Sequence, residues 1–339
     1  MRQYKWGILA PGTIANKFAT GLGVLPDAVK VAVGSRDIRR AEAFAKRHGF
    51  EKAYGSYHEL INDPQVDIIY VATPHTQHEE AAIACLNAGK AVLCEKPIAV
   101  NANQTKRMIQ CARKNRVFLM EAMWTRFLPT LYKLREILAN GAIGDIRLVY
   151  ADFGFHAEVN PESRLFAPAY AGGSLLDVGI YNLSFCSMVF GARPERIQSH
   201  MVIGGTGVDE ETALLFSYKE GQSALLNSSL RYNTPHIAHI IGTNGRIELP
   251  DYWHATVLRL YNGRGELAHE FNVPPYESEG YQFEAIEVMR CLDQGLKESP
   301  VMPLDESLAI MQTADLIRKE NRLFFPCDAN TGEEENEED

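Results

Sequence analysis

The sequence predicts two domains of different class: a doubly wound parallel α/β sheet, then an α+β domain with a mainly antiparallel sheet and flanking helices. Strand and helix patterns alternate up to about residue 124, after which long alternating strands and tight turns take over. A chain of 339 residues has the length of two ordinary domains. We therefore divide the chain into residues 1–124 and 125–330, and interpret the acidic segment 331–339 as a disordered tail.

The first part alternates regularly between strands and helices. Asp37 is a candidate N-cap of the second helix. Repeated β-α-β units with strongly apolar strands indicate a parallel sheet covered on both faces. The expected strands are 5–10, 29–34, 66–72, 91–94 and 117–121, and the expected helices are 13–23, 37–48, 57–62, 79–88 and 102–114.

The second part consists mostly of strands. Tight turns such as Glu220-Gly221 and Asn244-Gly245 separate several of them, which indicates antiparallel neighbours. The expected strands are 146–155, 196–203, 212–218, 223–232, 237–241, 246–249 and 255–261, with helices at 129–139, 174–190, 279–294 and 304–319.

Composition and charge narrow the class of protein. Hydrophobic residues make up 46% of the chain and charged residues 23%, as in ordinary globular proteins. The formal net charge of −9 gives no attraction to phosphate backbones, so nucleic acid is not expected as a partner. None of the six cysteines forms a C-x-x-C pair, and we recognise neither a signal peptide nor an apolar run long enough to cross a bilayer. We therefore expect a cytoplasmic protein without a membrane partner.

The segment that joins the first strand to the first helix is Ala10-Pro-Gly12-Thr13-Ile14-Ala15. It fits the dinucleotide fingerprint G-x-G-x-x-G with Ala in the first and third slots. Gly12 would let the backbone approach a pyrophosphate, and the helix N-terminus would offer free N–H groups. Ala10, Gly12, Thr13 and Ile14 are therefore candidate cofactor contacts. Taken alone, the motif also fits a tight strand–helix turn without a ligand.

The end of the second strand bears on the choice of dinucleotide. Dehydrogenases that select NAD place Asp or Glu here to hold the ribose hydroxyls, whereas this chain has Ser35 and Arg36, with Arg39 and Arg40 close behind. A hydroxyl and a planar guanidinium suit the 2′-phosphate of NADP. We therefore take Ser35, Arg36 and Arg40 as cofactor contacts and expect NADP, with NAD as the alternative. Arg39 and Arg40 could instead lie on a solvated helix face.

Polar residues also follow the strand at 66–72. Thr73, Pro74 and His78 should pass close to the cofactor, because ligands of parallel sheets bind at the carboxyl ends of the strands. We expect no metal at His75 and His78, since no further ligand cluster accompanies them. His78 is expected to cap or orient a loop.

The next strand ends in Glu95-Lys96-Pro97. A lysine at this point would lie in the crevice beside the nicotinamide. A desolvated ammonium there can lower the pKa of a nearby hydroxyl and stabilise developing negative charge. The alternative is a surface lysine with an ion-pair partner.

Asp177 and Tyr181 lie on the helix expected at 174–190, four residues apart and on one face. Gly179 between them would allow close approach of a cofactor ring. A Tyr beside a Lys suits proton transfer, its pKa lowered by the positive charge. An amphipathic helix with a buried Tyr explains the pattern equally well.

Together these motifs resemble the Gfo/Idh/MocA oxidoreductase family. The resemblance rests on Glu95-Lys96-Pro97, on Glu-Ala-Met-Trp-Thr-Arg-Phe-Leu-Pro at 121–129, and on Gly-Gly-x-x-x-Asp-x-Gly-x-Tyr at 172–181. It extends over the chain except the acidic tail. The branch it resembles most contains dimeric dihydrodiol dehydrogenase, NADP-dependent D-xylose dehydrogenase and glucose-fructose oxidoreductase.

The resemblance implies a dinucleotide-binding Rossmann domain and a second domain, with an open sheet, for substrate binding and homodimer formation. It implies that Lys96 and Tyr181 are catalytic, that Asp177 contacts Lys96 or the substrate, and that the Lys96-Pro97 bond is often cis. The candidate cofactor contacts then also include Glu95, Lys96, Trp124 and Arg126. Two residues depart from the family pattern: Ala10 stands where Gly is usual, and His75 where Asn is common.

We therefore expect an oxidoreductase that transfers hydride between NADP and a hydroxyl-bearing carbon of a cyclic polyol, with an aldose oxidised at C1 as the first choice. A trans-dihydrodiol dehydrogenase is the alternative enzyme, and an NADP-binding regulatory or sensor protein is the alternative of another class. A sensor need not keep Lys96, Asp177 and Tyr181. Phe155 and Trp253 are candidate substrate contacts, from an aromatic set that also includes Trp124, Phe153, Tyr170 and Tyr276.

Overall fold

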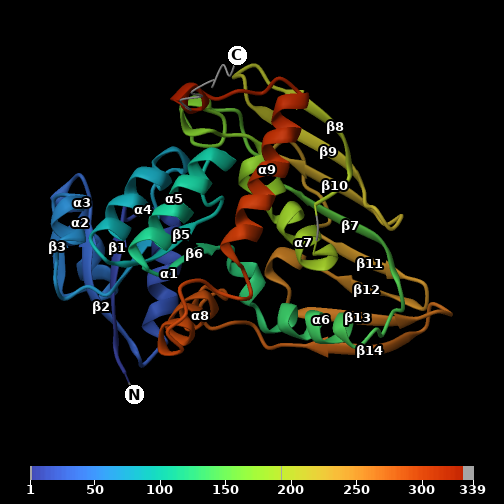
Figure 1. The fold of residues 1–339 in the computed structure, drawn as a ribbon, viewed down its shortest axis with the longest axis horizontal. Coiled ribbons are helices and arrows are strands. Elements are labelled where there is room, and N and C mark those ends of the chain that lie inside the picture. The colour runs from blue at the N-terminus through green and yellow to red at the C-terminus, as the bar shows by residue number, and fades with distance from the viewer. Residues whose placement is uncertain (1, 192, 331–339) are drawn as a thin grey trace, which may run out of the picture.

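The computed structural model describes residues 2–191 and 193–330. The protein contains two sheets with helices around them (Figure 1). The first sheet has six strands in the order β3-β2-β1-β4-β5-β6, and every neighbouring pair is parallel. Its strands are β1 (Tyr4–Leu9), β2 (Ala28–Gly34), β3 (Lys52–Tyr54), β4 (Ile68–Val71), β5 (Ala91–Glu95) and β6 (Leu119–Ala122). Its helices are α1 (Thr13–Gly23), α2 (Ile38–His48), α3 (Tyr57–Ile61), α4 (His78–Asn87) and α5 (Ala102–Asn115).

Burial explains the parallel sheet. All residues of β4 and β5 are buried, because helices cover both faces, and an apolar strand is stable only in such a position. Asp37 caps α2, its side chain accepting a hydrogen bond from the backbone N–H of Arg39. From β1 the sheet continues through β2 and β3 on one side and through β4, β5 and β6 on the other. This strand order confirms the doubly wound class.

The second sheet has eight strands in the order β14-β13-β12-β11-β7-β10-β9-β8, which confirms a mainly antiparallel sheet. One pair, β7 with β10, is parallel because a helical segment and a hairpin separate these strands in the chain. The strands are β7 (Ile146–Gly154), β8 (Arg196–Ile203), β9 (Asp209–Ser217), β10 (Ser223–Ser229), β11 (Ala238–Gly242), β12 (Gly245–Leu249), β13 (Val257–Asn262) and β14 (Leu267–Asn272).

Two short strands, β3 and β14, are absent from the sequence-based assignment. β14 is an edge strand with nearly every residue exposed, so its sequence has no buried alternating face to recognise. β3 has only three residues and lies at the edge of the first sheet. Both strands show that edge pairing depends on a neighbour already in place more than on local pattern.

Four long helices follow the first sheet in the chain: α6 (Pro129–Ala139), α7 (Ile180–Phe190), α8 (Gln282–Asp293) and α9 (Leu304–Glu320). α9 packs against α5 and α7 and so lies between the two sheets, while α8 packs against α1 (Figure 1). The opposite face of the large sheet carries exposed apolar side chains from adjacent strands, including Val202, Leu215 and Leu225.

One segment departs from the hydropathy expectation. Pro168–Phe190 is long and apolar enough to span a membrane by length and composition, and 78% of its most apolar window is buried inside the fold. Its hydrophobicity therefore reflects packing against protein on all sides.

All six cysteines are free thiols. The acidic tail at 331–339 lies outside the described residues.

Candidate active site

A cleft of about 700 Å³ runs from the carboxyl ends of β1, β2, β4 and β5 to the large sheet. It gathers all three predicted catalytic residues, both predicted substrate contacts, and every predicted cofactor contact except Trp124 and Arg126. The cleft therefore has two ends. One is formed by the loops after β1 and β2, and the other by Lys96, Asp177 and Tyr181.

The turn after β1 leaves open space where a ligand can approach. Gly12 is the N-cap of α1 in an extended conformation that any residue can adopt, and a Cβ built on it would meet nothing within 4 Å. Among the residues that the structure describes, no side chain caps this helix, so its first N–H groups face the cleft without a side-chain partner. Packing within the protein therefore does not require glycine at position 12. A pyrophosphate lying against the turn would require it, because a side chain would stand between the ligand and the backbone.

Ala10 occupies the first glycine slot at a conformational cost. Its φ of +72° lies in the left-handed region, which L side chains rarely adopt. The N–H of Ala10 still donates to the carbonyl oxygen of Gly34, at 3.0 Å. The turn thus keeps its shape with Ala, but the backbone conformation explains why glycine suits this slot.

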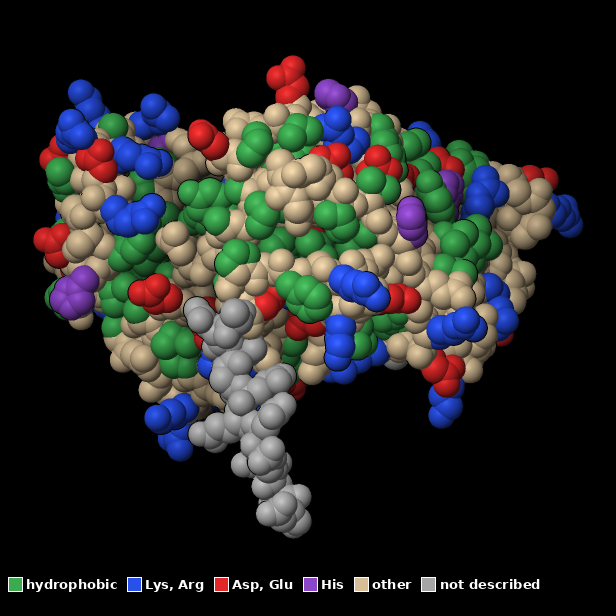
Figure 2. Space-filling view, turned by 90° about the horizontal axis from the view of Figure 1, so that it is seen from above, with side chains coloured by type: hydrophobic (Ala, Val, Ile, Leu, Met, Phe, Trp, Pro, Cys, Tyr) green, Lys and Arg blue, Asp and Glu red, His purple; other side chains and the backbone are tan. Residues whose placement is uncertain are grey.

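At the end of β2, Ser35 is buried and its Oγ accepts a hydrogen bond from the N–H of Asp37, at 3.2 Å. Arg36 and Arg40 line the cleft, whereas Arg39 points to solvent with 87% of its side chain exposed. Arg39 therefore fits the solvated-face interpretation, whereas Arg40, which is also exposed, lies on the cleft. Figure 2 shows Lys and Arg side chains gathered at this end of the molecule, where α2 lies.

His78 connects the loops that follow β4 and β5. One ring nitrogen lies 2.9 Å from the carbonyl oxygen of Pro97 and the other 2.9 Å from that of Thr73. The ring is fully buried, as a loop-orienting residue would be. His75 also lines the cleft, and burial holds its pKa well below the usual range, so it is neutral at physiological pH.

The Lys96 ammonium lies at the centre of the catalytic end. Its Nζ donates to the backbone oxygen of Asp177 at 2.6 Å, is 3.7 Å from the Asp177 carboxylate, and stands 4.7 Å from the centre of the Tyr181 ring. Its side chain is only 13% exposed, so the surface-lysine alternative is wrong. The Lys96-Pro97 peptide bond is cis. Burial lowers the pKa of Lys96, although Asp177 opposes this shift.

Tyr181 differs from the expectation in the direction of its pKa. Burial raises the pKa of the phenol well above 10, so desolvation outweighs the effect expected from Lys96. The Trp124 indole N–H donates to the phenol oxygen at 3.0 Å and opposes the rise by stabilising the phenolate. A π-helical turn, Leu175–Gly179, precedes α7 and carries Asp177.

Gly179 serves packing rather than cofactor approach. A Cβ on this residue would lie 2.9 Å from the Ser228 hydroxyl of β10, so the glycine lets the π-helical turn rest on the sheet. The turn itself is held by Asp209, whose carboxylate accepts from the Leu175 N–H at 2.7 Å and from the Ser174 hydroxyl at 2.8 Å. Burial raises the pKa of Asp209 to about 6.

Two predicted cofactor contacts lie behind the cleft instead of on it. Trp124 is 2% exposed and stacks on Tyr281 with 4.5 Å between ring centres. Arg126 is buried and donates to Ser184, at 2.9 Å, and to Glu306, as its guanidinium needs partners once desolvated.

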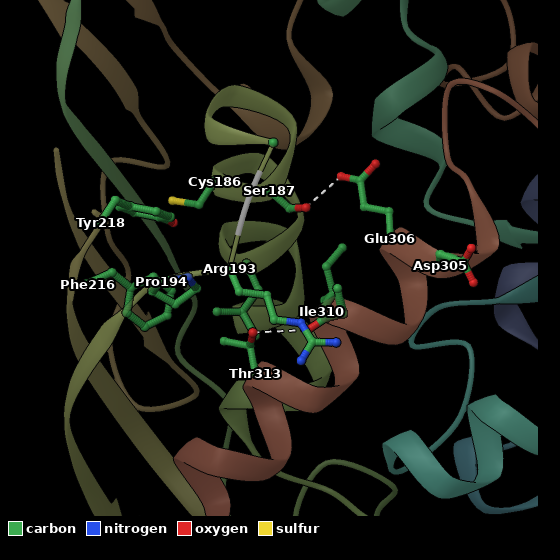
Figure 3. Close-up of a pocket in the computed structure, with 13 residues that line it drawn as sticks. Cys186, Ser187, Arg193, Pro194, Phe216, Tyr218, Asp305, Glu306, Ile310 and Thr313 are labelled. Carbon is green, nitrogen blue, oxygen red and sulfur yellow. Dashed lines mark hydrogen bonds between the residues drawn. The ribbon is translucent and has the colours of Figure 1, made fainter. Parts of the chain in front are cut away.

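Glu306 also accepts from the Ser187 hydroxyl, at 2.6 Å, beside a second cavity of about 310 Å³ between α7 and α9 (Figure 3). Because Arg126 is buried among these partners and does not line the cleft, the cofactor role predicted for it is corrected to a structural one. It joins the segment after β6 to α7 and α9.

The sequence does not predict a role in the site for Arg164. Its Nη1 donates to the Asp177 carboxylate at 2.7 Å, and its side chain lines the cleft with 59% exposed. No local motif marks this arginine, since it stands in an irregular loop between β7 and the π-helical turn.

The aromatic wall of the catalytic end is formed by Phe153, Phe155 and Trp253. Phe153 stacks on Trp253 with ring centres 5.1 Å apart and lies 5.4 Å from Tyr181. Tyr170 and Tyr276, also in the candidate aromatic set, do not line the cleft. Residues 2–191 and 193–330 contain no group of three or more His, Cys, Asp or Glu side chains suited to a metal ion.

Comparisons with known proteins agree on one class of enzyme. The oxidoreductase family Gfo/Idh/MocA, with its NAD-binding Rossmann fold, matches residues 5–123, and its C-terminal domain matches residues 131–248. Trans-1,2-dihydrobenzene-1,2-diol dehydrogenase of Mus musculus is 43% identical over 335 residues, which are 96% of this chain and 98% of the mouse protein. The Homo sapiens enzyme of that name is 41% identical over 338 residues, covering 96% and 98% of the two chains.

Solved structures share the fold at lower identity. Aldose-aldose oxidoreductase from Caulobacter crescentus, complexed with glycerol, has a TM-score of 0.85 at 23% identity. Levoglucosan dehydrogenase, in complex with NADH and levoglucosan, has a TM-score of 0.86 at 19% identity. Each match covers 95% of this chain and 98% of the other. A 3-ketoreductase from Actinomadura kijaniata, in complex with NADP and TDP-benzene, has a TM-score of 0.82 at 24% identity and covers 94% and 98%.

Proposed function

This chain belongs to the Gfo/Idh/MocA oxidoreductase family, and we propose that it moves a hydride between NADP and a hydroxyl-bearing carbon of a cyclic polyol. The observation that carries the proposal is the position of Lys96 against Asp177 and Tyr181, at the opposite end of the cleft from the open turn at Gly12. A bound nicotinamide supplies the hydride acceptor or donor. The protein supplies position, charge and the proton route.

In the direction of oxidation, Tyr181 takes the hydroxyl proton of the substrate at its phenol oxygen. The phenol must first release its own proton to solvent in the cleft, and the Trp124 N–H, 3.0 Å from that oxygen, stabilises the phenolate that results. Lys96 holds the substrate oxygen through an ammonium N–H and stabilises its negative charge. Asp177, which is an anion because Lys96 and Arg164 lower its pKa to about 2 against the effect of burial, keeps the ammonium in place.

An aldose oxidised at C1 is the first substrate we propose. Flat apolar faces of a sugar ring would lie against Phe153, Phe155 and Trp253. A trans-dihydrodiol is the second, and identities of 39–43% to trans-1,2-dihydrobenzene-1,2-diol dehydrogenases over nearly the whole chain favour it. A panel of aldoses and cyclic trans-diols, assayed with NADP, separates the two.

NADP is the proposed cofactor because Ser35, Arg36 and Arg40 line the cleft where the ribose 2′-phosphate would lie, and Asp37 is engaged with Arg39. Fluorescence titration of the cofactor-free protein should give tighter binding of NADPH than of NADH. Ser35→Asp should weaken NADPH binding about a hundredfold and should not weaken NADH binding, since it replaces a hydroxyl donor by an anion that repels the 2′-phosphate. Equal binding of both dinucleotides would refute the preference, and binding of neither would refute the proposed reaction.

A sensor remains the proposal of another class, and it would bind NADPH without turning over any member of the panel. We further propose that residues 1–124 bind the dinucleotide and residues 125–330 bind substrate, in a cytoplasmic homodimer. The exposed apolar side chains Val202, Leu215 and Leu225 support pairing through the open face of the large sheet. Light scattering of the native protein and of Leu225→Glu tests this, with a monomer expected for the variant only.

A further inference from the structure

The catalytic end of the cleft holds more polar groups than removal of one proton requires. Asp177 is 6% exposed and lines the cleft, yet only its Oδ1 has partners, Arg164 at 2.7 Å and Lys96 at 3.7 Å. Within residues 2–191 and 193–330, Asp177 Oδ2 has no hydrogen-bond partner. Because Asp177 lines the cleft, its Oδ2 can accept a hydrogen bond from a group that binds there.

Arg164 has unused hydrogen-bond donors, which complement the unused acceptor of Asp177. A guanidinium offers five N–H donors, and in the part of the chain that the structure describes only Nη1 is used, toward Asp177. The side chain is 59% exposed on the cleft, so the remaining donors are accessible to a ligand.

The loop that carries Arg164 is held in place by backbone contacts. The carbonyl oxygen of Leu165 accepts from the N–H of Gly173 at 2.8 Å, and the next side chain, Phe166, is fully buried. A Cβ on Gly172 would lie 2.8 Å from the carbonyl oxygen of Arg164, so the loop rests directly on the turn that leads to Asp177. The backbone at Arg164 is therefore packed against the turn that leads to Asp177, and from there the side chain reaches the Asp177 carboxylate.

Together the two side chains present an acceptor beside a donor. A hydroxyl group needs that combination, because it donates one hydrogen and accepts through its lone pairs. A substrate oxygen held by Lys96 has the Asp177 carboxylate next to it, so the group within reach is the oxygen on the neighbouring carbon. We infer that the Arg164–Asp177 pair binds a second hydroxyl, on the carbon adjacent to the reacting carbinol, and that this site selects vicinal diols.

The inference rests on the proposed function, and it covers aldoses and dihydrodiols alike, since both carry adjacent hydroxyls. A site built to hydrogen-bond a hydroxyl rejects an analogue that lacks it, because its own polar groups are then left unpaired. The matched substrates are D-glucose against 2-deoxy-D-glucose, and trans-cyclohexane-1,2-diol against cyclohexanol.

The first measurement is kcat/KM with NADP for each pair. The native protein should prefer the vicinal diol by about a hundredfold or more. In Arg164→Gln that preference should fall at least tenfold, in Arg164→Lys it should fall less, and in the exposed-loop control Arg264→Gln it should not change. Comparable kcat/KM within each pair, or an Arg164→Gln preference equal to the native one, would overturn the inference while leaving the proposed reaction intact.

A second measurement does not depend on turnover. Quenching of the fluorescence of Trp253, which lines the cleft, reports binding of trans-cyclohexane-1,2-diol and cyclohexanol to the NADP-loaded protein. The diol should bind at least tenfold more tightly than the mono-alcohol, and Arg164→Gln should remove most of that difference. Equal affinities in the native protein would refute diol selection. Failure to bind NADPH or NADH in the preceding titration would instead refute the proposed function.

Discussion

The two ends of the cleft present their charged and polar groups in different ways. The end near α1 and α2 consists of short contiguous segments, residues 10–14 and 35–40, with free backbone N–H groups and exposed guanidinium groups. The catalytic end brings together side chains far apart in sequence, such as Lys96 and Asp177, separated by 81 positions. There Lys96 and Asp177 are buried, Arg164 is partly exposed, and each charge is the partner of another.

This difference determines how each end should respond to substitution. Exposed charges are screened by water and salt, so their contributions are modest and nearly independent of one another. Buried charges that share partners are coupled, and removal of one leaves another without compensation. Variants at the catalytic end should therefore have large, non-additive effects on turnover, and variants at the other end smaller effects on cofactor affinity.

The largest expected effect is that of Lys96→Met. Loss of the ammonium removes both the group that holds the substrate oxygen and the positive charge beside Tyr181, so kcat should fall about a thousandfold or more. The dissociation constant of NADPH should change by less than about threefold. Steady-state kinetics and fluorescence titration measure the two quantities, with Lys133→Met on the surface of α6 as control. Near-native turnover of Lys96→Met would refute the catalytic assignment.

Tyr181→Phe tests the coupling. The variant should lower kcat about a hundredfold, because the proton acceptor is lost. The double variant Lys96→Met/Tyr181→Phe should be no slower than Lys96→Met alone, since both residues act on one oxygen. If the two losses multiply, the residues act independently and the contrast between the two ends fails.

The same Tyr181→Phe substitution should also reduce the free energy of unfolding by about 1–3 kcal/mol. The buried Trp124 indole N–H loses its acceptor, and such a group is costly to leave unpaired. Urea unfolding measures this cost, and unchanged stability would mean that the Trp124–Tyr181 hydrogen bond contributes little.

At the other end, Gly12→Ala should separate binding from stability. A Cβ at this position meets no atom within 4 Å, so the free energy of unfolding should change by less than about 0.5 kcal/mol. The methyl group would lie between the turn and a pyrophosphate, and NADPH affinity should fall about tenfold. An unchanged dissociation constant would show that the cofactor does not approach this turn.

The smallest expected effect is a gain in stability. Ala10→Gly relieves a φ of +72° at a position where glycine carries no penalty, and the cost of that conformation exceeds the extra entropy that glycine loses on folding. The free energy of unfolding should rise by about 0.5–1 kcal/mol in urea titration. A loss of stability would indicate that the Ala10 methyl group makes a packing contact of greater value.

The residues at the carboxyl ends of the parallel strands, at both ends of the cleft, show how much of the site local sequence patterns predict. The fold class follows from apolar strands alternating with helices, and the positions of Gly12, Ser35 and Lys96 at the carboxyl ends of strands follow from that fold. Chirality and short connections leave few topologies for such a pattern. These residues could therefore be placed on one cleft without coordinates, and the structure agrees with that placement.

The catalytic end could be predicted only in part. Asp177 and Tyr181 were found through motif spacing and family resemblance, whereas Arg164 stands in an irregular loop with no periodicity to mark it. Trp124 and Arg126 belong to a recognised motif, but only packing reveals that one supports Tyr181 and the other joins helices.

The order of the elements, the two sheets and the residues at the strand ends can be predicted from the sequence, because they depend on periodicity and on the handedness of the chain. Which distant side chains share a carboxylate, which of them are desolvated, and in which direction the pKa of Tyr181 moves become visible only in the folded structure. Those properties depend on distance and burial in space, which neighbours in sequence do not set.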